Sequence, residues 1–539
     1  MAVVVNAGVI SVGCNIGLTG VILPSLRKPS SDIILTRDQE SWFGKSQQNN
    51  LIMNILSKLI VILLCSSIFD LRDTIYERYV NNTSMSRHVF SLASMINFGS
   101  MIGTITCGVL TNYFGRKKTM ILANIFSISG FLFLRFANNV SLLYVSRILG
   151  GISFGLCFAN IPPYTGEINH PRIRKFTGSL MPTLYNIGIV TTFALSTQFT
   201  WKTIVSIMLC FPCGVTVVLF FCPESPTWLM TKGKKKEAIS NMEELRGNSE
   251  LAMKEIETIE NNLSRQKEVA NTAHGDSVLK QKWNVLSKGT FIRPFIVVLV
   301  LLSLGWHCTG GPVLGFYIID ILKGFKIDEL VDLYSCAVII SCCQLLFGIF
   351  ATIIASKIPR RKLFMGCGTV VLTGTLIIGT TVYLNRQEYF IQYTKDYPAL
   401  NWASFIGILV LYAGYFGGYV PVCFIFLSEL LPSNARSIGS SMVTTFSILF
   451  LFILIKFSPT LISTEDGIGL DGSFWSFSGI TSCTILFCYF FVPETFGKSL
   501  ESIEDHYRKV CYGTKIVPSK CMNIGKEKDI CNIDIVTKL

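Results

Sequence analysis

The chain has 539 residues, of which half are hydrophobic and only 15% carry a charge, and its net charge at pH 7 is +13. This composition excludes an ordinary soluble domain and a disordered chain. The basic residues recur at intervals between long apolar segments, a distribution that does not predict binding to nucleic acid.

Apolar segments long enough to cross a bilayer recur along the chain. One crossing by a helix needs about 20 mainly apolar residues. The sequence predicts twelve such helices, at 3–25, 91–110, 118–137, 142–162, 177–198, 203–222, 294–316, 331–355, 363–383, 402–427, 437–458 and 474–492. The first lacks a basic region before it and a small-residue cleavage site, so we interpret it as an uncleaved anchor. A closed β-barrel would need strands of alternating polarity, which these segments lack, so we expect an all-α membrane protein.

The segment 45–90 differs from its surroundings. It is rich in Asn, Ser, Ile and Leu, and its part from Leu51 to Phe69 is apolar enough to imitate a further span. Such a span would put every later basic loop on the wrong side of the membrane, against the positive-inside bias. We interpret the segment as an irregular insertion in the first outer loop, or as a retained intron. Candidate glycosylation sites are Asn81, Asn82 and Asn139.

Charged motifs repeat in the same order in the two halves of the chain. Glu167 is followed seven positions later by Arg174, and Glu429 is followed seven positions later by Arg436. Two further pairs of motifs are Gly115-Arg116-Lys117-Lys118 with Pro359-Arg360-Arg361-Lys362, and Pro223-Glu224-Ser225-Pro226 with Pro493-Glu494-Thr495. Internal repetition of helices around charged hinges is typical of secondary transporters.

The turn that contains Arg116 and Lys117 can pair with carboxylates at neighbouring helix ends, such as Glu167 and Glu224. Such pairs would hold one face of the protein shut in one conformation and separate in the other. The alternative is charge that only sets topology, since a lone exposed pair contributes little. The repetition in both halves favours a two-state latch.

Basic residues lie on alternate connections between the predicted helices, and the opposite connections are nearly free of Lys and Arg. The positive-inside bias therefore places both termini and the long central loop in the cytoplasm. We expect a multi-pass protein of the plasma membrane with six parts. These are the first helix and the start of the first outer loop (1–44), the insertion (45–90), the rest of the N-terminal six-helix bundle (91–222), a cytoplasmic linker with short surface helices (223–293), the C-terminal six-helix bundle (294–492) and a cytoplasmic tail (493–539).

The motifs resemble those of the major facilitator superfamily and, within it, of the sugar porter family. The segment from Asn112 to Lys117 is similar to the loop signature of the superfamily. Further segments resemble signatures of the sugar porter family. They are Arg147 together with Pro162 to Ile168 and Arg174; Pro223 to Leu229; Ser428 to Pro432 together with Arg436; and Pro493 to Glu501. Ser41-Trp42 resembles the trehalose-transporter-like branch.

The resemblance implies a major facilitator fold of two six-helix bundles with alternating access to one central site. It also implies gating or latch residues, which here are Arg116, Lys117, Arg147, Glu167, Arg174, Glu224, Arg360, Arg361, Glu429, Arg436 and Glu494. We predict a membrane transporter that moves a sugar (trehalose or hexose-like) or a polyol by facilitative uniport. A transporter of a less polar organic solute and a non-transporting solute sensor are the alternatives.

Neither an enzyme nor a cofactor or metal site is predicted. No nucleophile–base constellation occurs, and the 18 cysteines lie mostly within predicted helices, without metal-ligand or disulfide spacing. The expected partners are a small solute and the lipid bilayer, and we expect a monomer.

Several positions where the resemblance implies sugar-binding groups hold other residues. Side-chain amides donate and accept hydrogen bonds at once, which suits hydroxyl groups, and aromatic rings cover the apolar face of a sugar. The implied amides are replaced by Trp306, His307 and Pro312 in the seventh helix and by Pro182 in the fifth. The predicted substrate-binding residues are Asn15, Trp306, His307, Tyr317, Phe424 and Ser447.

Proton coupling depends on two of these residues. Asn15 aligns with a position where proton-coupled sugar porters carry an acid, and an amide cannot titrate. Uniport is therefore the better hypothesis unless His307 carries the proton. A buried ionisable residue in an apolar helix is a functional candidate, and a neutral histidine hydrogen-bonded within the bundle is the alternative.

Overall fold

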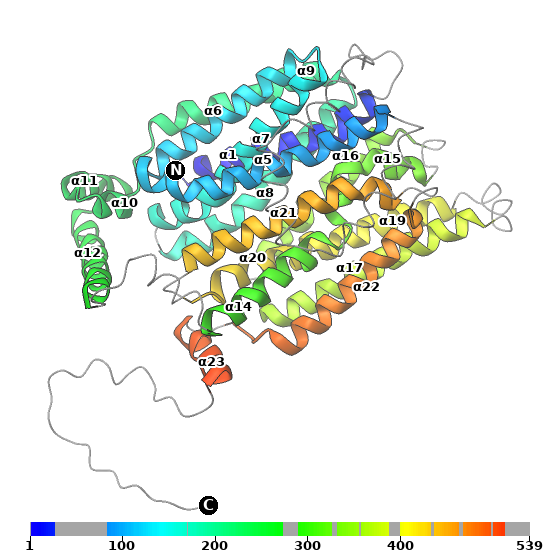
Figure 1. The fold of residues 1–539 in the computed structure, drawn as a ribbon. Helices are drawn as coiled ribbons and strands as arrows, with labels where there is room; N and C mark the ends of the chain where they lie inside the picture. Colours follow the sequence, from blue (N-terminus) through cyan, green and yellow to red (C-terminus); the bar gives the residue numbers. More distant parts are fainter. Residues whose placement is uncertain are drawn as a thin grey trace, which may run out of the picture.

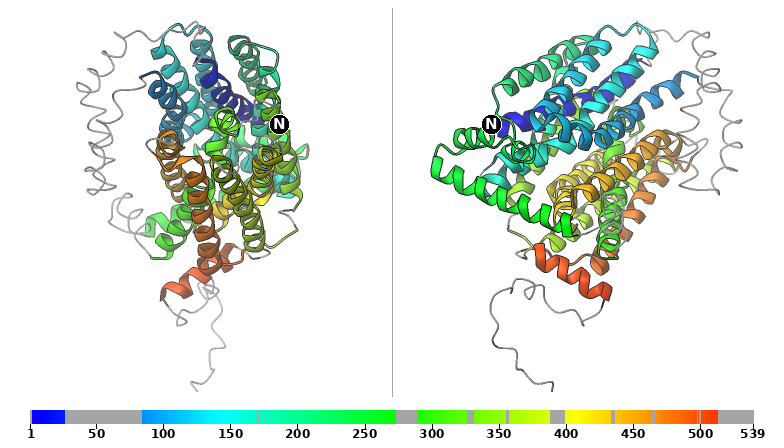
Figure 2. Two further views of the ribbon diagram at one scale, coloured as in Figure 1. Left: turned by 90° about the vertical axis from the view of Figure 1, so that its right-hand side faces the viewer. Right: turned by 60° about the vertical axis from the view of Figure 1, so that its left-hand side comes forward.

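The computed structural model describes residues 2–26, 84–169, 171–272, 289–325, 331–354, 357–387, 399–432, 436–462, 467–496, 498 and 500–512. Within these ranges the regular elements are helices. The long helices form two bundles that lie side by side, one from each half of the chain, as Figures 1 and 2 show. The prediction of an all-α protein built from two helix bundles is confirmed.

The N-terminal bundle contains α1 (Ala2–Leu26), α5 (Ser84–Phe114), α6 (Arg116–Arg135), α7 (Val140–Ile168), α8 (Pro171–Ser196) and α9 (Trp201–Phe220). Glycines let its helices approach closely. A methyl group at Gly99 of α5 would lie 2.2 Å from the Ile148 carbonyl oxygen of α7, and one at Gly13 of α1 would lie 2.0 Å from the Tyr185 carbonyl oxygen of α8. Small residues at such crossings are a common solution in membranes, where packing rather than the hydrophobic effect drives association.

The C-terminal bundle contains two interrupted spans. The first consists of α14 (Gly289–Val300), the π-helix η1 (Leu301–His307) and α15 (Gly311–Gly324), and the second of α19 (Ala399–Gly414), the π-helix η3 (Tyr415–Tyr419) and α20 (Val420–Glu429). The uninterrupted helices are α16 (Leu333–Ile354), α17 (Arg360–Arg386), α21 (Arg436–Ile462) and α22 (Gly469–Phe491). The segments 294–316 and 402–427 were expected to be single helices, and the π-helical turns within them are a correction. Such turns are frequent at functional sites.

Eleven described helices, with each interrupted span taken as one, are long and apolar enough to cross a membrane. The remaining long helix of the N-terminal bundle, α8, includes the polar residues Thr183, Tyr185 and Asn186. Helix α5 begins at Ser84, so 84–90 belong to a helix rather than to the insertion expected at 45–90. The rest of that expected insertion, 45–83, lies outside the described residues.

The two halves meet along three pairs of helices: α5 with α21, α8 with α16, and α1 with α15. Between α5 and α21, the Thr104 and Thr445 hydroxyls are 3.5 Å apart, and the ring centroids of Phe98 and Phe452 are 6.0 Å apart. Helix α8 therefore lies where the halves meet, against α16.

Short helices cover one end of the bundles. Helices α10 (Pro226–Thr231), α11 (Lys235–Arg246) and α12 (Ser249–Thr272) share a small core that contains Leu229, Met242 and Ile256. Helix α23 (Leu500–Tyr512) packs against α14. Figure 1 shows these helices at the same end as the N-terminus. Because the basic turns before α6 and α17 also lie there, we call it the basic end.

Candidate functional site

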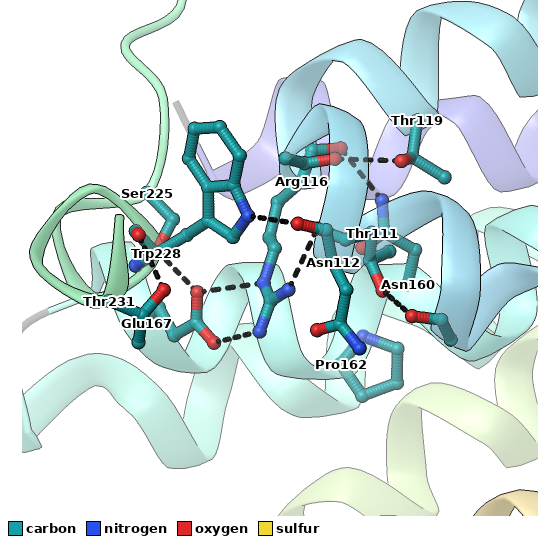
Figure 3. A network of polar contacts seen from close by, with 12 residues as sticks. Thr111, Asn112, Arg116, Thr119, Asn160, Pro162, Glu167, Ser225, Trp228 and Thr231 are labelled. Carbon is teal, nitrogen blue, oxygen red and sulfur yellow. Dashed lines mark hydrogen bonds and ion pairs between the residues drawn. The ribbon is translucent and has the colours of Figure 1, made fainter. Parts of the chain in front are cut away.

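Charged residues of the first half converge where α6, α7 and α10 meet, as Figure 3 shows. The Arg116 guanidinium donates from Nε to Glu167 Oε2 at 3.2 Å and from Nη2 to Glu167 Oε1 at 3.1 Å. The Ser225 hydroxyl donates to the same carboxylate. A two-point contact fixes the orientation of the guanidinium as well as its position. It therefore ties the start of α6 to the end of α7.

Glu224, which was expected to pair with a basic side chain, instead caps helix α6. Its Oε1 accepts hydrogen bonds from the backbone N–H groups of Arg116 at 2.8 Å and Lys117 at 3.0 Å. The first N–H groups of a helix have no partner within the helix, and the helix dipole favours a carboxylate there. Gly115 permits this approach, because its φ is +95° and a methyl group at Gly115 would lie 2.4 Å from Glu224 Oε2.

The second half repeats both contacts. Arg360 Nη2 lies 2.9 Å from Glu429 Oε1, which connects α17 with α20. Glu494 accepts hydrogen bonds from the backbone N–H groups of Arg360 at 3.0 Å and Arg361 at 3.2 Å. We call the set Arg116, Glu167 and Glu224 the first latch, and the set Arg360, Glu429 and Glu494 the second latch. The repeat in the sequence is thus a repeat of contacts.

Each latch connects helices of the same half, whereas the pairs were expected to close one face of the protein. The first latch joins α6 to α7 and to the segment before α10, and the second joins α17 to α20 and to the segment after α22. The paired side chains are 17–20% exposed, so solvent partly screens the ion pairs. The latches make the basic end of each half one rigid unit.

Lys117 and Arg361, the second basic residue of each turn, bind the ends of other helices. Lys117 Nζ donates to the Phe220 carbonyl at 2.8 Å, at the end of α9. Arg361 donates to the Tyr489 carbonyl near the end of α22. A cation that binds carbonyl groups in the last turn of a helix is favoured by the helix dipole.

Arg147 does not lie with the latches. It is 20 residues before Glu167 on α7, which at 1.5 Å per residue is about 30 Å. The side chain is buried in the N-terminal bundle, and its Nη1 donates to the Asn15 carbonyl at 3.1 Å. The side chains of Arg174 and Arg436 lie outside the described residues.

The first interrupted span shapes the region between the halves. Helix η1 ends at His307, and Gly310 has a φ of +81°, a region that favours glycine. Two tyrosine hydroxyls of the second interrupted span bind carbonyls beside the break: Tyr415 donates to Trp306 at 3.3 Å, and Tyr412 donates to Gly311 at 3.2 Å. Backbone groups released by a broken helix need such partners within a membrane.

His307 is fully buried and bonded on one side only. Its Nε2 lies 2.8 Å from the Ser447 hydroxyl of α21. Its Nδ1 has no hydrogen-bond partner among the described residues. Since a neutral imidazole has one donor and one acceptor nitrogen, Nδ1 can bind a hydroxyl in either tautomer. The structure thus brings together two predicted residues, His307 and Ser447.

Trp306 and Phe424 form an aromatic wall with a phenylalanine of the other half. The ring centroid of Trp306 lies 4.9 Å from that of Phe424, and the rings are nearly perpendicular. Phe158 of α7 stacks on Trp306 at 6.2 Å and contacts Phe424 edge-on at 5.5 Å. The contact of Phe158 with Trp306 could not be predicted from the sequence, because aromatic residues are common in apolar helices.

Two predicted substrate residues make helix-packing contacts instead. Asn15 Nδ2 donates to the Ser11 carbonyl of its own helix at 3.2 Å, and its amide lies against Gly150 of α7. The Tyr317 hydroxyl donates to the Ile455 carbonyl of α21 at 3.2 Å. Asn15 therefore contacts the interior of the N-terminal bundle, and Tyr317 ties α15 to α21.

Two buried amides were missed from the sequence. Asn186 of α8 is 1% exposed and Gln344 of α16 is 5% exposed, on one of the three helix pairs along which the halves meet. A signal was present, because each is the only Asn or Gln in the sequence of its helix. A lone amide in an apolar helix is the same kind of signal that pointed to His307.

The described residues contain no group of three or more His, Cys, Asp or Glu that could hold a metal ion. Of the candidate glycosylation sites, Asn139 is exposed immediately before α7. Asn81 and Asn82 lie outside the described residues.

Comparison with known sequences finds a matching protein family and several relatives. The family of sugar (and other) transporters matches residues 59–507. The facilitated trehalose transporter Tret1 of Bombyx mori is 28% identical over 444 residues, which cover 82% of each chain. That of Apis mellifera ligustica is 26% identical over 419 residues, which cover 77% of this chain and 79% of the relative.

Solved structures of a bacterial transporter share the fold. The inward-open xylose transporter XylE from E. coli superimposes with a TM-score of 0.67 at 17% identity, over 94% of this chain and 98% of that chain. The structure of XylE as a proton:xylose symporter bound to 6-bromo-6-deoxy-D-glucose gives the same TM-score at 18% identity, with the same coverage. At this identity the likeness shows the fold alone.

Proposed function

The chain belongs to the family of sugar (and other) transporters, and from this premise we propose that it carries a sugar or a sugar-like polyol across the plasma membrane. It is a membrane transporter rather than an enzyme, with the twelve-helix fold of the major facilitator superfamily. We propose facilitative transport by alternating access, with trehalose or a hexose as cargo, because the relatives named above are facilitated trehalose transporters.

The observation that carries the proposal is the meeting of an aromatic wall with unsatisfied polar groups between the halves. Trp306 and Phe424 offer flat apolar surface, and directly beside Trp306 the Nδ1 of His307 has no hydrogen-bond partner within the described ranges. The centroids of the Trp306 and His307 rings are 4.3 Å apart. A sugar needs both surfaces, because its ring carries apolar C–H faces and polar hydroxyls.

The predicted substrate residues take different roles in this proposal. Trp306 and Phe424 cover the sugar, and His307 binds a hydroxyl group. Ser447 orients His307 through the 2.8 Å contact. Asn15 and Tyr317 hold helices in place rather than touch the sugar, since their side chains already bind backbone carbonyls.

Uniport is supported by the surroundings of Arg147. The buried guanidinium donates to the Asn15 backbone carbonyl, and the Asn15 side chain cannot carry a proton. A coupled transporter needs a titratable group that changes protonation during the cycle. His307 is the residue that could still couple transport to protons.

The basic end faces the cytoplasm in the proposed orientation. It carries the N-terminus, α10 to α12 and α23, together with both latches. Loops rich in Lys and Arg remain on the cytoplasmic side during insertion. Because both halves of the central site come from one chain, we propose that a monomer is sufficient for transport.

One alternative cargo has support from a specific observation. Phe158, Trp306 and Phe424 bring three aromatic rings to the region between the halves. A less polar organic solute would suit that wall better than a small sugar. A sensor that does not transport is disfavoured, because the matching family and the relatives named above are transporters.

Uptake of labelled trehalose, glucose and a polyol panel into transporter-deficient cells or oocytes tests the proposal. Measurements at two external pH values separate uniport from proton coupling. Saturable uptake of at least one sugar, unchanged by pH, is expected. Absence of sugar uptake despite surface expression contradicts the proposed cargo, and strong stimulation by acid contradicts uniport.

A further inference from the structure

Helix α7 carries a buried positive charge that no acidic side chain of the described residues balances. Arg147 is 3% exposed, and the Asn15 carbonyl, 3.1 Å from Nη1, is the hydrogen-bond partner of its guanidinium within the described chain. The only acidic residue buried in that part of the chain is Asp471, which lies on α22 of the other half. Burial of an ionised group is costly unless an opposite charge or several hydrogen bonds compensate it.

The carbonyl of Asn15 compensates only a fraction of this charge. A guanidinium group has five N–H donors and keeps its proton in proteins, whereas a carbonyl oxygen accepts from one of them and carries only a partial negative charge. Arg246 shows the usual arrangement in the same protein. Its side chain is 6% exposed, and it makes a two-point contact with the Glu255 carboxylate at 3.0 and 2.7 Å. Arg147 is buried as deeply and lacks such a partner among the described residues.

Asn97 of α5 is a second unsatisfied polar side chain at the level of Arg147. It is fully buried, and neither its Nδ2 nor its Oδ1 has a hydrogen-bond partner in the described part of the chain. It lies two residues before Gly99, which packs on the Ile148 carbonyl, and Arg147 directly precedes Ile148. Both helices end beside the first latch and so run in the same direction, which puts the two residues at one level. On helical projections both fall on the flank of the α5–α7 interface where Arg147 reaches Asn15 of α1.

We propose that Arg147 and Asn97 form a binding site for a small monatomic anion, chloride in the cell, inside the N-terminal bundle. The remaining N–H groups of the guanidinium and the Nδ2 group of Asn97 donate to the ion from two helices. A spherical ion accepts hydrogen bonds from several directions, whereas a carboxylate requires a planar arrangement of donors. The deep burial of both residues favours an ion of this size over an organic anion.

The ion would bind where the N-terminal bundle meets the other half. Helix α1 contacts α15 and helix α5 contacts α21, and the proposed site adjoins both α1 and α5. A ligand that binds the folded protein and not the unfolded chain stabilises the folded state in proportion to its occupancy. We therefore expect chloride to stabilise the protein. The inference goes beyond the proposed function, and its test uses no transport measurement, so it stands or fails separately from the cargo.

Binding of radiolabelled chloride to the full-length protein purified in detergent tests the proposal. We expect saturable binding of about one ion per chain, displaced by bromide and not by gluconate. Unfolding by denaturant, followed by intrinsic fluorescence, is compared in sodium chloride and sodium gluconate at equal ionic strength, so that general screening is the same. The midpoint should rise with chloride and then saturate.

Three variants locate the ion. Arg147→Gln should weaken chloride binding at least about tenfold, and Asn97→Leu, which keeps the positive charge, should weaken it several-fold. Asn15→Asp supplies a carboxylate of the same shape, because the Asn15 amide lies against Gly150, one turn along α7 from Arg147. Its midpoint should no longer depend on chloride, and this result does not require that Arg147→Gln folds.

The matched control is Arg246→Gln, which removes a buried guanidinium that already has its own carboxylate in Glu255. It should bind chloride as the wild type does. The proposal is wrong if the wild type binds no chloride, if gluconate displaces the ion as well as bromide does, or if Arg246→Gln loses as much binding as Arg147→Gln. Full chloride dependence in Asn15→Asp also contradicts it.

Discussion

Replacing Glu224 by alanine should destabilise the N-terminal bundle, and two backbone contacts set the size of the effect. Glu224 Oε1 binds the N–H groups of Arg116 at 2.8 Å and Lys117 at 3.0 Å. Loss of a capping acceptor costs about 1 kcal/mol per contact, and loss of a negative charge at a helix N-terminus adds about 0.3–1 kcal/mol. Glu224→Ala should therefore lower the free energy of unfolding by about 2–3 kcal/mol. Glu224→Gln keeps an acceptor and should lower it by about 1 kcal/mol or less.

The assay is unfolding of the purified protein in detergent, followed by intrinsic fluorescence as denaturant is added. Glu494→Ala is the matched variant, because Glu494 binds the N–H groups of Arg360 and Arg361 in the second half. It should cost as much as Glu224→Ala. If the glutamine variant at 224 is as unstable as the alanine variant, charge rather than hydrogen bonding stabilises the turn. If neither variant differs from the wild type, the reasoning about the cap is wrong.

Further changes test the aromatic wall, the buried histidine, a cation–π contact and the insertion. Phe158→Ala opens space beside the wall, so the ratio of labelled trehalose to glucose uptake should rise several-fold; an unchanged ratio would exclude Phe158 from the site. His307→Ala should raise the KM for sugar about tenfold, whereas an unchanged uptake curve at two pH values would make His307 structural. Phe496→Ala removes the ring 5.6 Å from the Arg360 guanidinium and should cost about 0.5–1 kcal/mol in the unfolding assay; a loss as large as that of Glu494→Ala would contradict this. Transcript reads across the junction of 44 and 91 should include forms without 45–90, and if every read contains the segment, the retained-intron hypothesis fails.

The sequence predicted the long helices and the latches because both rest on strong local signals. A bilayer crossing demands about 20 mainly apolar residues, so each span is visible without knowledge of its neighbours. Charged residues are rare between such spans, and Arg116, Glu167, Arg360 and Glu429 belong to motifs that recur in the same order in both halves. The structure places these four in two equivalent ion pairs.

The interruptions of two spans could not be predicted, because they depend on contacts between distant segments. The break after Trp306 is stabilised by the Tyr415 hydroxyl, 109 residues later in the chain. The function of Glu224 was missed for a related reason, since a carboxylate can bind either a basic side chain or a backbone N–H, and only the fold decides between them.

One buried amide lies a helical turn away from the position where the resemblance implied an amide. The resemblance directed attention to Pro182, where an amide was implied and is absent. Asn186 lies four residues later, one helical turn along the same face of α8. A comparison made position by position misses an amide that has moved by one turn, whereas the isolation of Asn186 in an apolar helix makes it visible without any comparison.

The latches and the central site differ in how freely their residues can change. Glu224 and Glu494 bind backbone N–H groups, and these donors are present whatever side chains occupy the two turns. The side chains around the turns can therefore vary: Phe496 lies 5.6 Å from the Arg360 guanidinium, and Tyr113 lies 5.9 Å from the Lys232 ammonium, so aromatic rings lie beside both cations. The central site binds its cargo through side chains, and every substitution there changes what can bind. A chain of this kind can keep its transport mechanism while its specificity diverges.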